Sequence, residues 1–165
     1  VAKTKDDPTD DGNESNAIVN FNGDISDFIF TNKQVLRSFS ATNCKPGEAL
    51  WTLDLVTDKY SWETSWGLYE KVSGSSISLA SGPPENTKYN RQTRYIGGLC
   101  LPPGRYFIRW FDKWGDGICC QYGEGEWIVR IDGEVVLQND PEDDNFTERD
   151  FPFEVRVRIE MEEGM

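Results

Sequence analysis

The sequence predicts an all-β protein, an antiparallel β-sandwich of the jelly-roll type that is stapled by disulfide bonds. From Ile18 onward, short apolar runs are interrupted every 8 to 15 residues by Gly, Pro, Asn or Asp, which is the spacing of an all-β domain. No window of about 11 residues or more shows a helical period. The chain has four cysteines and no C-x-x-C pair, which favours disulfides over a zinc site.

The chain length of 165 residues is that of one ordinary domain. Residues 1–16 are acidic and lack aromatic side chains, so they are expected to form a flexible extension. Residues 17–160 are expected to form a single β-sandwich domain. The acidic residues 161–165 are expected to form a frayed tail.

The predicted strands cover residues 25–30, 34–41, 50–56, 65–72, 76–80, 105–111, 125–131, 134–138 and 151–160. Along 151–160 the apolar residues from Phe153 to Ile159 alternate with charged residues, which predicts one core face and one solvated face. In 105–111 both faces carry bulky side chains. That strand should therefore be central in its sheet or covered on both sides.

Two short motifs predict the turns that delimit these strands. Asp132-Gly133 lies between 125–131 and 134–138, and it predicts a two-residue β-hairpin. Pro102-Pro103-Gly104 precedes 105–111 and marks the entry into that strand.

Charge and composition exclude several classes of function. With 29 acidic against 17 basic residues the net charge is −12, which disfavours binding to nucleic acids and to anionic membranes. The chain has no His, so Ser-His, Cys-His and His-metal chemistry are excluded. No apolar run approaches the length of about 18 residues that spans a bilayer. Membrane insertion is not expected.

The cysteines Cys44, Cys100, Cys119 and Cys120 predict disulfides and therefore an extracellular or cell-surface location. A bond between the adjacent Cys119 and Cys120 would close a strained ring. Ordinary bridges from this pair to Cys44 and Cys100 avoid the strain and are favoured, with the pairing left open. They would pin the loop 112–124 onto two other segments. The sequons at Asn13 and Asn145 are compatible with a secreted glycoprotein.

The loop after strand 105–111 has features of a calcium site. Asp112, Asp116 and Gly117 match positions 1, 5 and 6 of an EF-hand loop, whereas Trp114 and Gly123 stand at positions 3 and 12, where that loop carries oxygen ligands. An EF-hand is thus excluded. A glycine-rich turn with two carboxylates still offers the hard oxygens that calcium binds.

A second acidic loop follows strand 50–56 and carries Asp58 and Glu63. It could reach the same end of the sandwich, so that two loops converge on one calcium ion. The alternative is that Asp112 and Asp116 only cap turns through hydrogen bonds from their side chains to the backbone. Both interpretations stay open at this stage.

Aromatic side chains surround the two acidic loops. Trp66, Trp110 and Trp127 lie inside predicted strands and are expected in the core. The loop residues Trp62, Trp114 and Tyr122 are candidates for stacking against a ligand such as a sugar. Glu63 and Asp116 could in principle act as a glycosidase pair. Catalysis has the least support, and the protein is not expected to be an enzyme.

The segments TDKYSWETSWGLYE and CLPPGRYFIRWFDKWGDGICCQYGEGEWIVRIDGEVV resemble a domain type of secreted and cell-surface microalgal proteins. The domain type that the chain resembles also recurs in large exported bacterial proteins, including metalloproteases and adhesins, as a non-catalytic β-sandwich appendage with a G-D-G-I-C-C loop between two strands. The resemblance covers roughly residues 44 to 154. It implies an extracellular module with a calcium-bound loop, to which Asp58, Glu63, Asp112 and Asp116 would contribute. Trp114 departs from the resemblance, since a small residue or Tyr is more usual there.

The expected function is therefore that of a non-catalytic, calcium-stabilised binding or assembly module of a cell surface, wall or matrix. The alternatives are a carbohydrate-binding domain that uses the loop aromatics, and a small glycan-active hydrolase. The expected partners are other extracellular proteins, glycans, or further copies of the chain in a repeated assembly.

Overall fold

The computed structural model describes residues 44–83, 86–115, 117, 119–120, 123–143 and 145–156. Several expectations lie outside these residues: the extension 1–16, the strands 25–30 and 34–41, the tail 161–165, Asn13, Asp116 and Tyr122.

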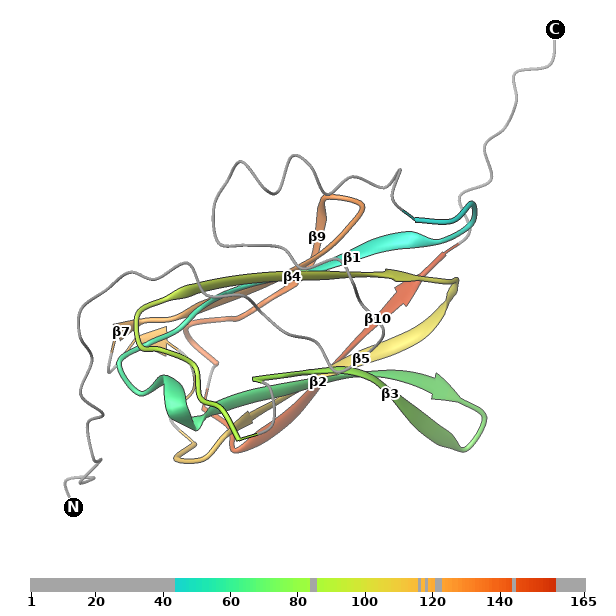
Figure 1. The fold of residues 1–165 in the computed structure, drawn as a ribbon. Helices are drawn as coiled ribbons and strands as arrows, with labels where there is room; N and C mark the ends of the chain where they lie inside the picture. Colours follow the sequence, from blue (N-terminus) through green and yellow to red (C-terminus); the bar gives the residue numbers. More distant parts are fainter. Residues whose placement is uncertain are drawn as a thin grey trace, which may run out of the picture.

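Two antiparallel four-stranded sheets form the fold (Figure 1). The first sheet has the order β4-β1-β8-β9, with β4 at Arg94–Leu101, β1 at Ala49–Val56, β8 at Glu126–Ile131 and β9 at Glu134–Gln138. The second sheet has the order β10-β5-β2-β3, with β10 at Glu148–Val155, β5 at Gly104–Asp112, β2 at Thr64–Val72 and β3 at Ser75–Gly82. A short 3-10 helix, η2 at Ser61–Glu63, precedes β2, and the short strands β6 (Cys119–Cys120) and β7 (Gly123–Glu124) pair with each other.

Most of the expected strands within the described part of the chain are found at the expected places. The predictions 50–56, 65–72, 76–80, 105–111, 125–131 and 134–138 match β1, β2, β3, β5, β8 and β9 to within two residues at each end. The prediction 151–160 was displaced, because β10 begins at Glu148 and ends at Val155. Strands β4, β6 and β7 were missed. In β4 the pair Gly97-Gly98 interrupts the apolar run on which strand prediction depends.

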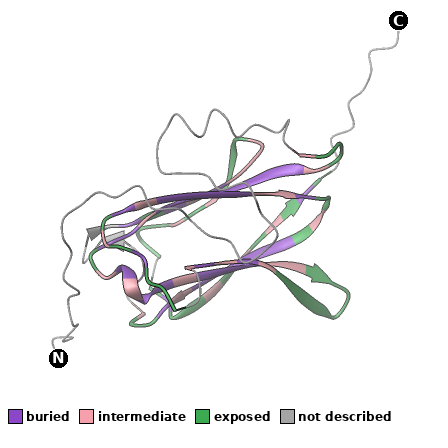
Figure 2. Ribbon diagram, viewed as in Figure 1, coloured by how far each residue is buried: buried purple, intermediate pink, exposed green. Residues whose placement is uncertain are grey.

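The core lies between the two sheets and is built around tryptophan. Four of the six tryptophans are completely or almost completely buried, and they form a row of ring contacts, Trp51 to Trp66 at 5.9 Å, Trp66 to Trp110 at 6.4 Å and Trp110 to Trp127 at 5.2 Å. The row starts on β1 of the first sheet, crosses to the paired strands β2 and β5 of the second sheet, and returns to β8 of the first sheet. Figure 2 shows the corresponding buried stretches on the strands of both sheets. The antiparallel, disulfide-stapled β-sandwich is therefore confirmed, and so is the expectation that the strand tryptophans are core residues.

The position of β5 confirms the prediction, made from the bulky side chains on both of its faces, that this strand is central in its sheet or covered on both sides. It lies between β10 and β2, so it is central in the second sheet. Trp110 points into the core, while Phe107 on the other face is also buried. Phe107 stacks on Tyr69 of β2 with ring centroids 5.0 Å apart.

The Asp132-Gly133 hairpin is also confirmed. These two residues join β8 to β9, and both have the positive φ angles, 50° and 84°, that a type I′ turn requires. The turn is also tied to the neighbouring strand β1, because the Asp132 side chain accepts a hydrogen bond from Leu50 N at 2.9 Å and Asp132 N donates to Leu50 O at 2.8 Å.

In the described part of the chain, no helix has the length and apolar character needed to cross a membrane.

Candidate functional site

Strand pairing brings Glu63 and Asp112 to the same end of the second sheet. Thr64, the first residue of β2, is the register partner of Asp112, the last residue of β5. Glu63 precedes Thr64 at the end of η2, and its carbonyl oxygen accepts a hydrogen bond from Lys113 N at 3.3 Å. Both acidic residues are buried, with 6% and 1% of their surface exposed. The two loops that the sequence analysis expected to converge do so at this point.

The Asp112 carboxylate shapes the turn that follows β5. Its Oδ1 accepts a hydrogen bond from Trp114 N at 3.2 Å, and its backbone oxygen accepts one from Gly115 N at 3.2 Å. Asp112 N in turn donates to Thr147 O at 2.9 Å. Gly115 has a φ of 70°, and a Cβ added there would lie only 3.1 Å from Thr147 Cγ2, so glycine is needed at that position. Asp112 therefore caps this turn, and its other oxygen, Oδ2, is buried.

Asp58 lies in the loop between β1 and η2, and it is buried as well. Its Oδ1 accepts a hydrogen bond from Tyr60 N at 2.8 Å, and its carbonyl oxygen accepts one from Gln92 N at 3.0 Å. Tyr60 O accepts from Glu63 N at 3.1 Å, so a short chain of contacts links Asp58 to Glu63.

The loop that carries Asp58 and Glu63 is held by hydroxyl groups against the segment before β4. Thr57 Oγ1 donates to Asn90 O at 2.6 Å and accepts from Thr93 N at 2.9 Å. Ser61 Oγ donates to Tyr89 O at 2.7 Å. Thr57 and Ser61 are both buried, so these bonds fix the backbone in place. The contribution of Thr57 and Ser61 was not predicted, because hydroxyl residues in a loop give no signal of their own in the sequence.

The donor chemistry of this end suits a hard cation. Among the described residues, no three acidic or cysteine side chains lie close enough together to form a metal site by themselves. A cation at this end would need backbone carbonyls beside Glu63 and Asp112, and calcium accepts carbonyl oxygens as readily as carboxylates. Asp116, the other ligand expected in this loop, lies outside the described residues.

Two of the three loop aromatics can be placed. Trp114 is exposed, with 39% of its surface accessible, and it follows Asp112 by two residues. Trp62 is half-buried and packs edge-on against Tyr60, with ring centroids 5.0 Å apart. Of these two described aromatics, Trp114 is the more accessible to a ligand. The glycosylation candidate Asn145 is exposed.

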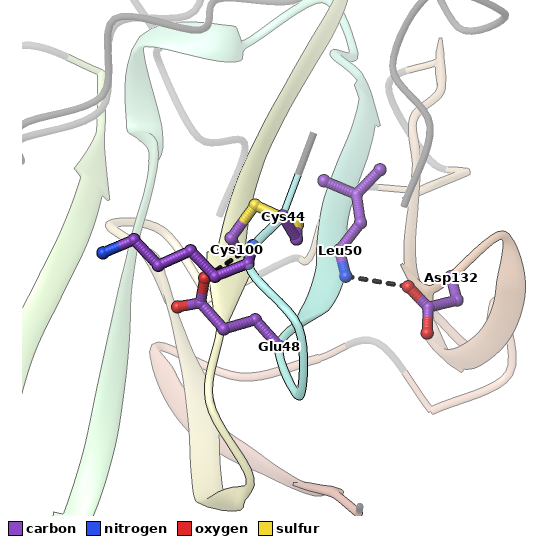
Figure 3. Close-up of a disulfide and its surroundings, with 6 residues drawn as sticks. Cys44, Glu48, Leu50, Cys100 and Asp132 are labelled. Carbon is purple, nitrogen blue, oxygen red and sulfur yellow. Dashed lines mark hydrogen bonds between the residues drawn. A yellow bond between two sulfur atoms is a disulfide. The ribbon is translucent and has the colours of Figure 1, made fainter. Parts of the chain in front are cut away.

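The disulfide expectation was wrong in its pairing. Cys44 is bonded to Cys100, so neither can bridge to Cys119 or Cys120, and the loop 112–124 is not pinned through them (Figure 3). The reason is the missed strand β4: its antiparallel pairing with β1 sets Cys100 opposite Leu50, close to the segment that begins at Cys44. Cys119 and Cys120 have their backbone in β6, and their side chains lie outside the described part of the structure.

Searches of protein-family models, curated proteins and solved structures find no match to this chain.

Proposed function

We propose that this protein is a non-catalytic extracellular module for binding or assembly, and that a calcium ion stabilises the end of the sandwich where Glu63 and Asp112 lie. The observation that carries the proposal is the burial of three carboxylates, Asp58, Glu63 and Asp112, on two loops that meet. Removing an ionised carboxylate from water is unfavourable unless opposite charge or hydrogen bonds compensate. Asp58 and Asp112 each accept a backbone hydrogen bond, and a divalent cation would add opposite charge to this compensation.

Calcium fits this end better than other metals. The side chains offered are carboxylates, with backbone oxygens around them, and hard oxygen ligands select calcium over zinc or copper. Glu63 and Asp112 would hold the ion, with Asp58 and Asp116 as further candidates. When bound, the ion would neutralise the buried negative charge and tie the loop before β2 to the loop after β5.

The extracellular part of the proposal is supported by the disulfide and by charge. A disulfide between Cys44 and Cys100 persists best in an oxidising compartment. The net charge of −12 is compatible with secretion into a setting where calcium is plentiful.

Thermal unfolding with added calcium and with a chelator tests the proposal. At a calcium concentration of a hundred times Kd, the bound ion adds about 2.7 kcal/mol, which corresponds to a rise in melting temperature of about 5 to 10 °C. Asp112→Asn should abolish this rise. Glu142→Gln, which removes an exposed carboxylate elsewhere, should keep it.

An equal melting temperature of the unaltered chain in calcium and in chelator would overturn the calcium proposal. This comparison needs no variant, so it remains decisive even if Asp112→Asn fails to fold. A rise of the same size with magnesium would also count against it, because magnesium demands a smaller and more regular oxygen cage.

A further inference from the structure

An open groove of about 620 Å³ lies at the β2–β3 hairpin. This hairpin is at the opposite end of the second sheet from Glu63 and Asp112, since Val72 pairs with Ser75 at one end and Thr64 pairs with Asp112 at the other (Figure 1). The groove is lined by two cations, three hydroxyls and an aromatic ring, namely Lys71, Arg105, Ser73, Ser75, Ser76 and Phe107. No carboxylate is among its lining residues.

The two cations of the groove, Lys71 and Arg105, differ from arginines elsewhere in the two sheets in their ion pairing. Arg94 and Arg109 are engaged by the carboxylates of Asp54 and Asp150. Lys71 and Arg105 are both exposed, and neither takes part in an ion pair within the described residues. Their charge is thus available to a ligand.

The acidic register partner of Arg105 does not form an ion pair with it. Glu154 of β10 is the register partner of Arg105, yet its ion pair is with Arg156, at 3.6 Å.

The floor of the groove positions Lys71. Its Nζ lies 5.6 Å from the centre of the Phe107 ring, a cation–π contact. Phe107 is buried and stacks on Tyr69, so the floor is packed. A lysine that rests on a fixed ring loses less conformational entropy when it binds an anion than one that is fully mobile.

We propose that this groove binds an acidic sugar unit of an extracellular polysaccharide, one that carries a carboxylate or a sulfate group. The lysine and the arginine would hold the oxyanion through charge-assisted hydrogen bonds. The serine hydroxyls, which both donate and accept, match the hydroxyls of the sugar ring. Because the groove is open, a unit in the middle of a chain can enter it. An acidic peptide fits less well, because the groove offers hydroxyl groups where a peptide would need main-chain partners or apolar pockets.

The net charge of −12 does not prevent such binding. At physiological ionic strength, charges separated by more than about 8 Å are largely screened. The ligand therefore responds mainly to the two cations beside it. A sparsely charged oligosaccharide suits the site better than a dense polyanion, which would extend over the acidic remainder of the surface.

The inference goes beyond the proposed calcium site and does not depend on it. Titration calorimetry of the full chain with three trisaccharides provides the test: a trigalacturonate, a sulfated galactotriose and an unmodified galactotriose. Each is titrated with calcium and with a chelator, so that binding bridged by calcium is recognised. We expect at least one acidic trisaccharide to bind and the neutral one not to bind. Which of the two acidic sugars binds more tightly identifies the preferred oxyanion.

Paired variants then locate the site. Lys71→Gln with Arg105→Gln should weaken binding by at least about tenfold, because two charge-assisted contacts are lost. Lys59→Gln with Lys88→Gln changes the net charge equally at exposed positions outside the groove and should leave affinity unchanged. Trp114→Ala should also leave it unchanged. All four cationic residues that these two double variants replace are exposed. The melting temperatures of both double variants should therefore match that of the unaltered chain.

Four results would overturn the inference. One is equal affinity for neutral and acidic trisaccharides. Another is unchanged binding in the Lys71→Gln, Arg105→Gln variant, or binding that is lost with Trp114→Ala. The last is tighter binding of a short oligoglutamate peptide than of either acidic sugar, which would assign the groove to acidic peptides.

Discussion

The buried hydroxyl of Tyr106 makes the stability of the fold sensitive to alkaline pH. The residue is completely buried, and its hydroxyl donates to Pro102 O at 2.5 Å. Burial, and to a smaller extent the charges of Glu70 and Glu48, raise its pKa from 10.0 to about 12. The folded state thus holds the phenol proton more tightly than the unfolded state. This contribution to stability is complete below pH 10 and is lost as the pH rises toward 12.

Tyr106→Phe should therefore reduce the alkaline sensitivity of the fold. We expect the free energy of unfolding, measured by urea titration, to fall less between pH 9 and pH 11 in this variant than in the unaltered chain. Tyr89 and Tyr95, whose pKa values burial also raises, are present in both proteins, so the difference isolates Tyr106. Parallel curves over that range would show that the phenol does not contribute.

Sequence reasoning singles out a residue when its side-chain type is unusual for the segment in which it lies. Acidic residues in glycine-rich or short loops stand out, so Asp58, Glu63 and Asp112 were singled out from the sequence, and strand pairing brings the loops of Glu63 and Asp112 together. Lys71 and Arg105 were not singled out, because each is an ordinary charged residue on an alternating strand. Only the pairing of β2 with β5 places them beside one groove.

At the scale of elements, prediction succeeded for six strands, displaced β10 and missed β4, β6 and β7. The missed β4 had two consequences, because this strand both completes the first sheet and carries Cys100. Without it, no pairing of the cysteines could be derived, and the favoured one was wrong. The paired glycines Gly97 and Gly98 lie opposite Leu53 and Thr52 of β1.

An ion pair across the first sheet gives a prediction at the same scale. Asp54 of β1 is buried, and it contacts Arg94 of β4 and Arg130 of β8. Asp54→Ala should lower the free energy of unfolding by about 2 to 3 kcal/mol, since it leaves partly buried guanidinium groups unpaired. Asp150→Ala is the matched control: its pair with Arg109 is exposed, and its loss should cost under about 1 kcal/mol. Equal losses in urea titrations of the two variants would contradict this assignment.

At the scale of the whole molecule, the two ends of the sandwich carry opposite chemistry. Buried carboxylates gather at the end where β5 finishes, and accessible cations gather at the β2–β3 hairpin. The disulfide belongs to the second of these ends, because Cys100 lies near the end of β4, shortly before Arg105 of β5. The sandwich core between the ends keeps the two proposed sites apart, so each can be altered without changing the other.

The disulfide should stabilise the fold as a whole. Cys44 and Cys100 are 56 residues apart, and the loop that they close contains β1, β2, β3 and most of β4, which belong to both sheets. In the chain-entropy account a loop of this length contributes about 4 kcal/mol by restricting the unfolded chain. Cys44→Ser with Cys100→Ser should lower the free energy of unfolding by about 2 to 4 kcal/mol and increase the dependence on urea concentration, because the unfolded chain becomes more extended. Because both cysteines are replaced, the variant has no free thiol at either position. If the urea midpoint of the double variant equals that of the unaltered chain, the bridge adds nothing to stability, and the packing of the tryptophan row suffices to hold the sheets together.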